Sequence, residues 1–179
     1  RPTRMELSVH SHSRKWPHFF KILGHFIRSN SDFISTGITL IGMIETTLAA
    51  VLETLGKPLT IKDIELPELL VGQVLVKVLF SGVCRSQVME VCGGRGNDPW
   101  LPHLLGHEGS GIVVAVGDGV TKVTPGDEVI LGWIKGEGLD APGAKYKCGD
   151  QIINSGRVTT FSNYSIVSES RVVKKPVGD

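Results

Sequence analysis

Short apolar runs, broken by glycine, proline and charged residues, recur along the chain from residue 47 onward. The strongest strand prediction covers 73–80, where Val, Leu and Phe suit a half-buried pleated surface. A short helix is predicted over 85–91 and is ended by Gly93 and Gly94. The other predicted strands cover 49–53, 59–66, 111–116, 127–131, 161–167 and 171–175, and the Gly/Pro/Lys-rich stretch 132–150 is predicted to be a long loop. Short strands separated by frequent turns predict a mainly β fold, a barrel or a sandwich.

The composition is that of an ordinary globular domain. Of the 179 residues, 41% are hydrophobic and 21% are charged, and the net charge is +1. This near-neutral balance argues against nucleic acid or an anionic membrane as the main partner. No apolar run approaches the roughly 20 residues that a membrane helix needs. No G-x-G-x-x-G sequence opens a helix after a strand, so we predict no dinucleotide-binding βαβ unit in this chain.

The first 42 residues differ in composition from the rest. They carry six Lys/Arg against two acids, whereas residues 43–179 carry thirteen against sixteen. We expect 1–42 to be a basic extension that is disordered or not part of the native fold; the alternative is an organelle-targeting peptide. Met43 then begins the domain proper, which is expected to cover 43–176.

The three cysteines, Cys84, Cys92 and Cys148, are widely spaced and form no C-x-x-C pair. An odd number in this arrangement argues against a disulfide framework. A reducing, cytoplasmic compartment fits better and leaves the thiols free for metal.

The residues best suited to chemistry are Cys84, His107 and Glu108. Cys84 follows the strongest predicted strand and is next to Arg85, whose charge favours the metal-binding thiolate. His107 offers an imidazole nitrogen of the kind zinc prefers. Adjacent side chains on a strand point to opposite faces, so His107 and Glu108 reach one metal only if the backbone bends at Gly106 and Gly109. Otherwise Glu108 orients the site from outside the ligand set.

Around these residues lies an ordered set of fixed positions. The set is Gly82-Val83-Cys84-Arg85-Ser86, then Gly106-His107-Glu108-x-x-Gly111-x-Val113-x-x-Val116-Gly117, then Gly126-Asp127-x-Val129. It resembles the zinc-type alcohol dehydrogenases of the medium-chain dehydrogenase/reductase superfamily. The resemblance covers about 46–176 and implies their N-terminal catalytic domain, a GroES-like β-barrel, without the Rossmann domain.

The resemblance also implies roles for individual residues. Cys84 and His107 become ligands of a catalytic zinc, with Glu108 as the nearby carboxylate and a possible further ligand. Ser86 becomes the hydroxyl that passes on the alcohol proton, although from the sequence alone it also reads as a helix N-cap. Arg85 becomes the residue that approaches the pyrophosphate of NAD or NADP.

Three positions depart from the family pattern. Gln87 stands where family members usually carry an acid that supports the zinc site. Met89 stands where some members have a relay histidine. The loop 133–148 has only Cys148, and one thiol cannot make a four-cysteine structural zinc site, so we predict no structural zinc.

The family's zinc site has two cysteines and one histidine. The second cysteine and the nucleotide-binding domain are expected beyond Asp179, with 177–179 starting a linker to that domain. The sequence therefore predicts the catalytic-domain portion of a zinc-dependent, NAD(P)-linked dehydrogenase of alcohols and aldehydes, inactive alone and homo-oligomeric at full length. The alternatives are a GroES-like binding or assembly module and a zinc-free reductase of the same superfamily.

Overall fold

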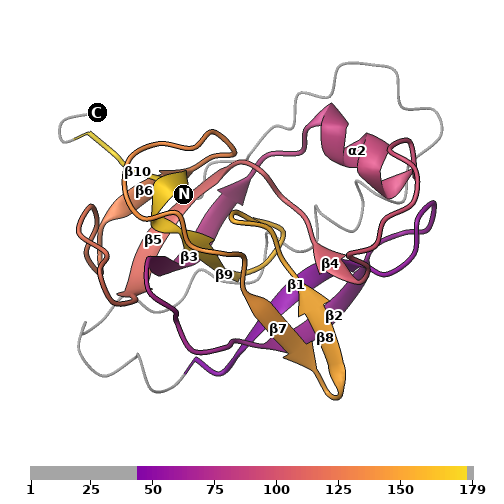
Figure 1. Ribbon diagram of the computed structural model, residues 1–179, viewed down its shortest axis with the longest axis horizontal. Coiled ribbons are helices and arrows are strands. Elements are labelled where there is room, and N and C mark those ends of the chain that lie inside the picture. The colour runs from indigo at the N-terminus through magenta and orange to yellow at the C-terminus, as the bar shows by residue number, and fades with distance from the viewer. Residues whose placement is uncertain (1–43, 177–179) are drawn as a thin grey trace, which may run out of the picture. The chain divides into compact units, whose positions relative to one another are not determined.

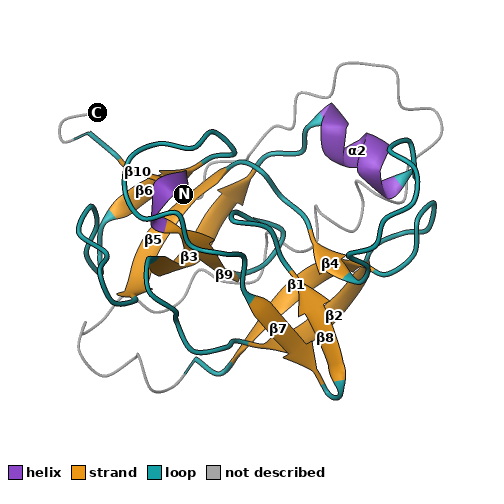
Figure 2. Cartoon of the chain, viewed as in Figure 1, coloured by secondary structure: helices purple, strands orange, loops and turns teal. Residues whose placement is uncertain are grey.

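The computed structural model describes residues 44–176 (Figure 1). The expected extension over 1–42 and the expected linker over 177–179 lie outside the described residues. Strands dominate the described part, as Figure 2 shows, and the mainly β fold expected from the sequence is confirmed. Within 44–176, none of the helices has the length and apolar content that crossing a membrane demands.

Five strands close into a barrel in the order β1-β2-β7-β8-β4. They are β1 (Thr46–Leu52), β2 (Thr60–Glu65), β4 (His103–Leu104), β7 (Lys145–Cys148) and β8 (Gln151–Asn154). β1 pairs antiparallel with β2 on one side and with β4 on the other, where Val51 lies opposite Leu104. The interior holds fully buried side chains such as Ile64, Tyr146 and Ile153, so the barrel is a packed core.

A second sheet of five strands has the order β10-β6-β5-β3-β9. Its strands are β3 (Gln73–Ser81), β5 (Gly109–Val116), β6 (Glu128–Leu131), β9 (Tyr164–Ser168) and β10 (Val172–Lys174). β3 and β5 pair antiparallel with Val76 opposite Val113, and the register shifts twice along the pair. Both valines are buried in the core of this sheet. In Figure 1 this sheet lies to the left of the barrel strands.

The helix α2 (Arg85–Val91) follows β3 and precedes the loop that leads to β4. It therefore lies in the sequence between Cys84 and His107. Its predicted bounds, 85–91, are confirmed. The short helix η1 (Glu169–Arg171) lies between β9 and β10.

The prediction of a long loop over 132–150 is wrong at its end, where β7 forms. β8 and the two-residue β4 were also not predicted. β7 reads Lys-Tyr-Lys-Cys, with only Tyr146 fully buried. One buried side chain in a stretch rich in Gly and Lys is too little alternation to identify a strand.

Candidate metal and active site

Cys84 and His107 come together although 23 residues separate them. Cys84 is the N-cap residue of α2, with φ −97° and ψ 159°, and lies just beyond β3. His107 follows β4 and precedes β5. The Sγ of Cys84 is 3.7 Å from the Nδ1 of His107, and both residues are partly buried. The fold thus places a thiol and an imidazole at one point between β3 and β5.

The separation of these two atoms suits a shared metal ion. Tetrahedral zinc holds a thiolate sulfur at about 2.3 Å and an imidazole nitrogen at about 2.0–2.1 Å, which sets the two donors about 3.6 Å apart. The observed 3.7 Å agrees with this value. Burial lowers the pKa of His107 below its ordinary value; the charge of Arg95 adds to the effect, while Glu90 and Glu108 oppose it. The neutral imidazole, which is the ligating form, is therefore favoured.

Ser86 lies beside the same thiol. Its Oγ is 2.8 Å from the Sγ of Cys84, so a group bound at the thiol would lie close to this hydroxyl. The reading of Ser86 as a helix N-cap is wrong, because Cys84 occupies that position and makes no side-chain capping bond. Arg85, the first residue of α2, is exposed to solvent.

Glu108 lies on the other side of the His107 backbone. It is exposed, and its side chain lies so close to Gly82 that a Cβ there would be 2.6 Å from the Cγ of Glu108. The Glu108 carbonyl accepts a hydrogen bond of 2.9 Å from the Gly82 amide. Over residues 44–176, Glu108 does not join Cys84 and His107 in a cluster with all donors within 4.8 Å. Its part in binding a metal stays a prediction.

Gly106 supplies the expected bend before His107. Its φ is +105°, in the region that favours glycine. A Cβ at this position would also lie 2.4 Å from the backbone nitrogen of Thr160. Gly109 does not adopt a positive φ; it is needed for close approach instead, because a Cβ would lie 2.6 Å from the Phe80 carbonyl oxygen. The two glycines therefore serve different purposes.

Gln87 fills the position where the family usually has an acid. It is fully buried in α2, and its carboxamide oxygen faces two backbone donors. It accepts hydrogen bonds from the amides of Gly106 and His107, the latter at 3.2 Å. Across the imidazole, the Trp133 ring lies 4.7 Å from that of His107, centre to centre, at 43°. Gln87 thus positions the backbone, and Trp133 covers the ring.

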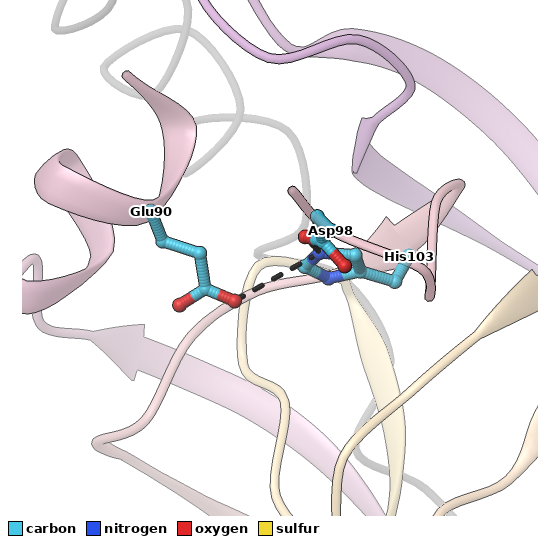
Figure 3. Close-up of side chains that lie close together, drawn as sticks. All are labelled: Glu90, Asp98 and His103. Atoms are coloured by element: carbon cyan, nitrogen blue, oxygen red, sulfur yellow. Dashed lines mark hydrogen bonds and ion pairs between the residues drawn. The ribbon is translucent and has the colours of Figure 1, made fainter. Parts of the chain in front are cut away.

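A second group of chemical side chains was not predicted. Glu90, Asp98 and His103 each offer one metal-binding atom, and these atoms lie within 4.8 Å of one another (Figure 3). All three residues line the same cavity of about 370 Å³ that His107 and Trp133 also line. In the sequence, the only indication of this group is that His103 stands four residues before His107, next to the Gly106-His107-Glu108 motif. Glu90 and Asp98 carry no spacing that links them to it.

Comparisons with known proteins identify relatives of this chain. The "Alcohol dehydrogenase class-3" of Dictyostelium discoideum is 34% identical over 155 residues, an alignment covering 72% of this chain and 40% of the relative. The crystal structure of an "alcohol dehydrogenase zinc-binding domain protein" from Burkholderia ambifaria has the same fold, with a TM-score of 0.59 at 22% identity over 74% of this chain and 42% of that one. A "putative zinc-binding dehydrogenase" from Sinorhizobium meliloti, solved "bound to NADP", gives 0.53 at 25% identity, over 74% and 39%.

The chain spans about two fifths of the length of these relatives. The sequence profile described as "Alcohol dehydrogenase GroES-like domain" matches residues 71–177. That match covers more than half of the chain. The fold with its closed barrel, the Cys84–His107 pair and the relatives all point to one assignment: the chain belongs to the alcohol dehydrogenase GroES-like domain family.

Proposed function

We propose that residues 43–176 are the catalytic-domain portion of a zinc-dependent, NAD(P)-linked oxidoreductase that transfers hydride between alcohols and aldehydes. One observation carries the proposal: the Sγ of Cys84 lies 3.7 Å from the Nδ1 of His107 and 2.8 Å from the Oγ of Ser86. A binding or assembly module needs no such arrangement. A zinc-free reductase has no use for a thiol and an imidazole at zinc-ligand separation.

In this proposal Cys84 and His107 hold the zinc, and Glu108 is the neighbouring carboxylate. When bound, zinc acts as a Lewis acid that lowers the pKa of an alcohol, and the nicotinamide accepts the hydride. Ser86, next to the Cys84 sulfur, passes on the alcohol proton, its Oγ accepting that proton as it releases its own hydroxyl proton toward solvent. Arg85, exposed at the start of α2, is free to approach the cofactor pyrophosphate. The Sinorhizobium relative, which was solved with NADP, supports a nicotinamide dinucleotide as the cofactor.

Residues 1–179 alone are proposed to be inactive. The chain matches only 40% of the Dictyostelium relative, and Cys84 and His107 are two of the three protein ligands that such a site requires. Neither Cys92 nor Cys148 joins them in a three-donor cluster within residues 44–176. The full protein is proposed to be a cytoplasmic homo-oligomer that carries no structural zinc, because Cys148 is the one thiol of the 133–148 loop.

Cobalt substitution tests the zinc site. Co²⁺ bound by a thiolate has a near-ultraviolet charge-transfer band, so the band should appear on titration of the chain and vanish in Cys84→Ser. Cys92→Ser is the matched control, because Cys92 is an exposed free thiol and the band should persist. A band of equal strength in Cys84→Ser would contradict the assignment.

A second measurement addresses the activity. Nicotinamide absorbance should show no turnover when residues 1–179 are mixed with NAD or NADP and a primary alcohol, and calorimetry should show no micromolar cofactor binding. Turnover by this chain alone would overturn the proposal that it is an inactive portion. The expected combination is a cobalt–thiolate charge-transfer band in residues 1–179 together with no turnover.

A further inference from the structure

Three side chains from separate segments converge on one point outside the Cys84–His107 pair. Glu90 lies on α2, Asp98 in the loop after it, and His103 begins β4. The Nε2 of His103 is 2.8 Å from an Asp98 oxygen and 3.8 Å from a Glu90 oxygen. Figure 3 shows Glu90 reaching from the helix toward the His103 ring, with Asp98 beside that ring in the view.

Each of the three side chains is anchored by its other polar atom. The Nδ1 of His103 lies 3.0 Å from the Leu104 carbonyl, which only accepts, so Nδ1 donates. The Oδ1 of Asp98 accepts from the Trp100 amide at 2.9 Å. The Oε2 of Glu90 lies 3.7 Å from the Arg95 guanidinium. The remaining atoms, one nitrogen and two oxygens, all face inward.

This anchoring determines what the inner atoms can bind. The 2.8 Å contact between Nε2 of His103 and Asp98 is a hydrogen bond that needs a proton between its two atoms. A cation bound here takes the place of that proton, and Nε2 and the two carboxylate oxygens then all act as donors of lone pairs to it. His103 is only 7% exposed, so bulk water has little access to its ring and cannot satisfy the inner atoms well. A histidine whose outer nitrogen donates to a backbone carbonyl has the orientation typical of a metal ligand.

We propose that Glu90, Asp98 and His103 form a second divalent-cation site, separate from the Cys84–His107 pair. One imidazole and two carboxylates suit Zn²⁺ or Mn²⁺ and lack the thiolate that marks the first pair. Nitrogen and oxygen donors on a tetrahedral zinc lie about 3.4 Å apart. The 2.8 Å distance from His103 to Asp98 would therefore lengthen, and the 3.8 Å distance from His103 to Glu90 would shorten, when the ion binds. The bound ion ties α2, the following loop and β4 together.

The test compares zinc binding in two variants of the whole chain. Cys84→Ser removes the thiolate site, and Cys84→Ser/His103→Ala removes both sites. Calorimetry with ZnCl₂ should show one more zinc per chain in the first variant than in the second, or an affinity at least about tenfold higher. The difference is the relevant quantity, because the four histidines in residues 1–42 are present in both variants and any zinc they take is the same in both. Equal binding in the two variants would overturn the proposal.

Asp98→Asn provides a milder change in case His103→Ala destabilises the fold. It retains the size of the side chain and the acceptor for Trp100 while removing the charge, so in the Cys84→Ser background it should also weaken zinc binding. Asp150→Asn, at an exposed position between β7 and β8, is the matched control and should leave zinc binding unchanged.

Nitrogen NMR of the His103 ring is a separate readout. A doubly protonated ring unaffected by ZnCl₂ would identify an ion-paired imidazolium and refute the site.

Discussion

The Cys84–His107 pair and the Glu90–Asp98–His103 cluster use the same two pieces of chain in different ways. Each draws one residue from the start or body of α2 and one from the segment that begins with β4. The pair has a thiol and an imidazole, whereas the cluster has two carboxylates and an imidazole. Ligand type would therefore separate the metals that the two proposed sites prefer, because thiolate favours softer ions and carboxylate favours harder ones.

The two groups also differ in what positions them. The pair depends on the backbone, through the left-handed Gly106 and the buried Gln87 that accepts from the Gly106 and His107 amides. The cluster depends on side chains that are each anchored by a polar atom of their own, such as His103 on the Leu104 carbonyl. Changes to the backbone before His107 should thus affect the pair first.

Gly106→Ala should have the largest effect. The new methyl would lie 2.4 Å from the Thr160 nitrogen, and φ of +105° is strained for alanine. Overpacking and backbone strain together should lower the free energy of unfolding by about 4 kcal/mol. Urea denaturation measures this loss, and the cobalt–thiolate band of the pair should weaken even in the fraction that remains folded.

Gly132→Ala is the matched control for that change. Nothing lies within 4 Å of a Cβ at Gly132, and its φ is outside the left-handed region. It should alter the free energy of unfolding by less than about 1 kcal/mol. If Gly106→Ala were as mild as Gly132→Ala, the backbone before His107 would not be the constraint on the pair.

Glu169 makes the stability of the fold depend on pH, and the two groups can be compared only at a pH where the fold is stable. It is buried in η1 and accepts hydrogen bonds from the amides of Thr121, Lys122 and Leu139 at 2.7–2.8 Å. Burial alone would raise the pKa of Glu169, but these three donors and the Lys122 charge outweigh it, so its pKa lies below the usual range. The resulting stability is present above the unfolded-state pKa and is lost as pH falls through the lower, folded-state pKa.

Glu169→Gln should therefore cost about 2–3 kcal/mol at neutral pH, because the new amide group faces an N–H donor. The difference from the wild type should shrink as pH falls below about 4, the ordinary pKa of Glu in an unfolded chain, because the unfolded wild type then binds a proton more readily than the folded protein does. Urea denaturation across this pH range measures the difference, with the exposed Glu68→Gln as control. A difference that stayed constant with pH would contradict the role of the charge.

The sequence was sufficient for features that depend on local pattern. The strand 73–80 and the helix 85–91 were predicted because the first has a run of Val, Leu and Phe and the second is followed by the glycines at 93 and 94. Cys84 and His107 were found because a known motif surrounds them. Their proximity across 23 residues agrees with that motif.

What could not be predicted depends on tertiary pairing. β4 has two residues and exists because Leu104 pairs with Val51 of β1, a partner 53 positions away. The Glu90–Asp98–His103 cluster forms only when that pairing brings His103 close to Glu90 of α2. The spacing of residues along the chain predicts neither contact. Both β4 and the cluster depend on closure of the barrel, so neither could be predicted from the sequence.

Gln87 offers the finest test of the contrast between the two groups. Its carboxamide oxygen accepts from the Gly106 and His107 amides, and the hydrogen bonds of Asp98 and His103 within residues 44–176 go to other groups. Gln87→Leu should leave two amides without a partner and lower the free energy of unfolding by about 2 kcal/mol. Binding of Co²⁺ at the thiolate should weaken, while the zinc that depends on His103 should be retained.

Gln87→Glu separates the hydrogen bonds from the charge. The carboxylate has the same length and accepts from the same two amides, so the fold should be retained, and it places a negative charge next to His107, the proposed ligand. A nearby anion stabilises a bound cation, so Co²⁺ affinity at the Cys84–His107 pair should rise in Gln87→Glu and fall in Gln87→Leu. Affinity changes of the same size at both groups in either variant would mean that the two are one coupled unit, because only the pair is supported by Gln87.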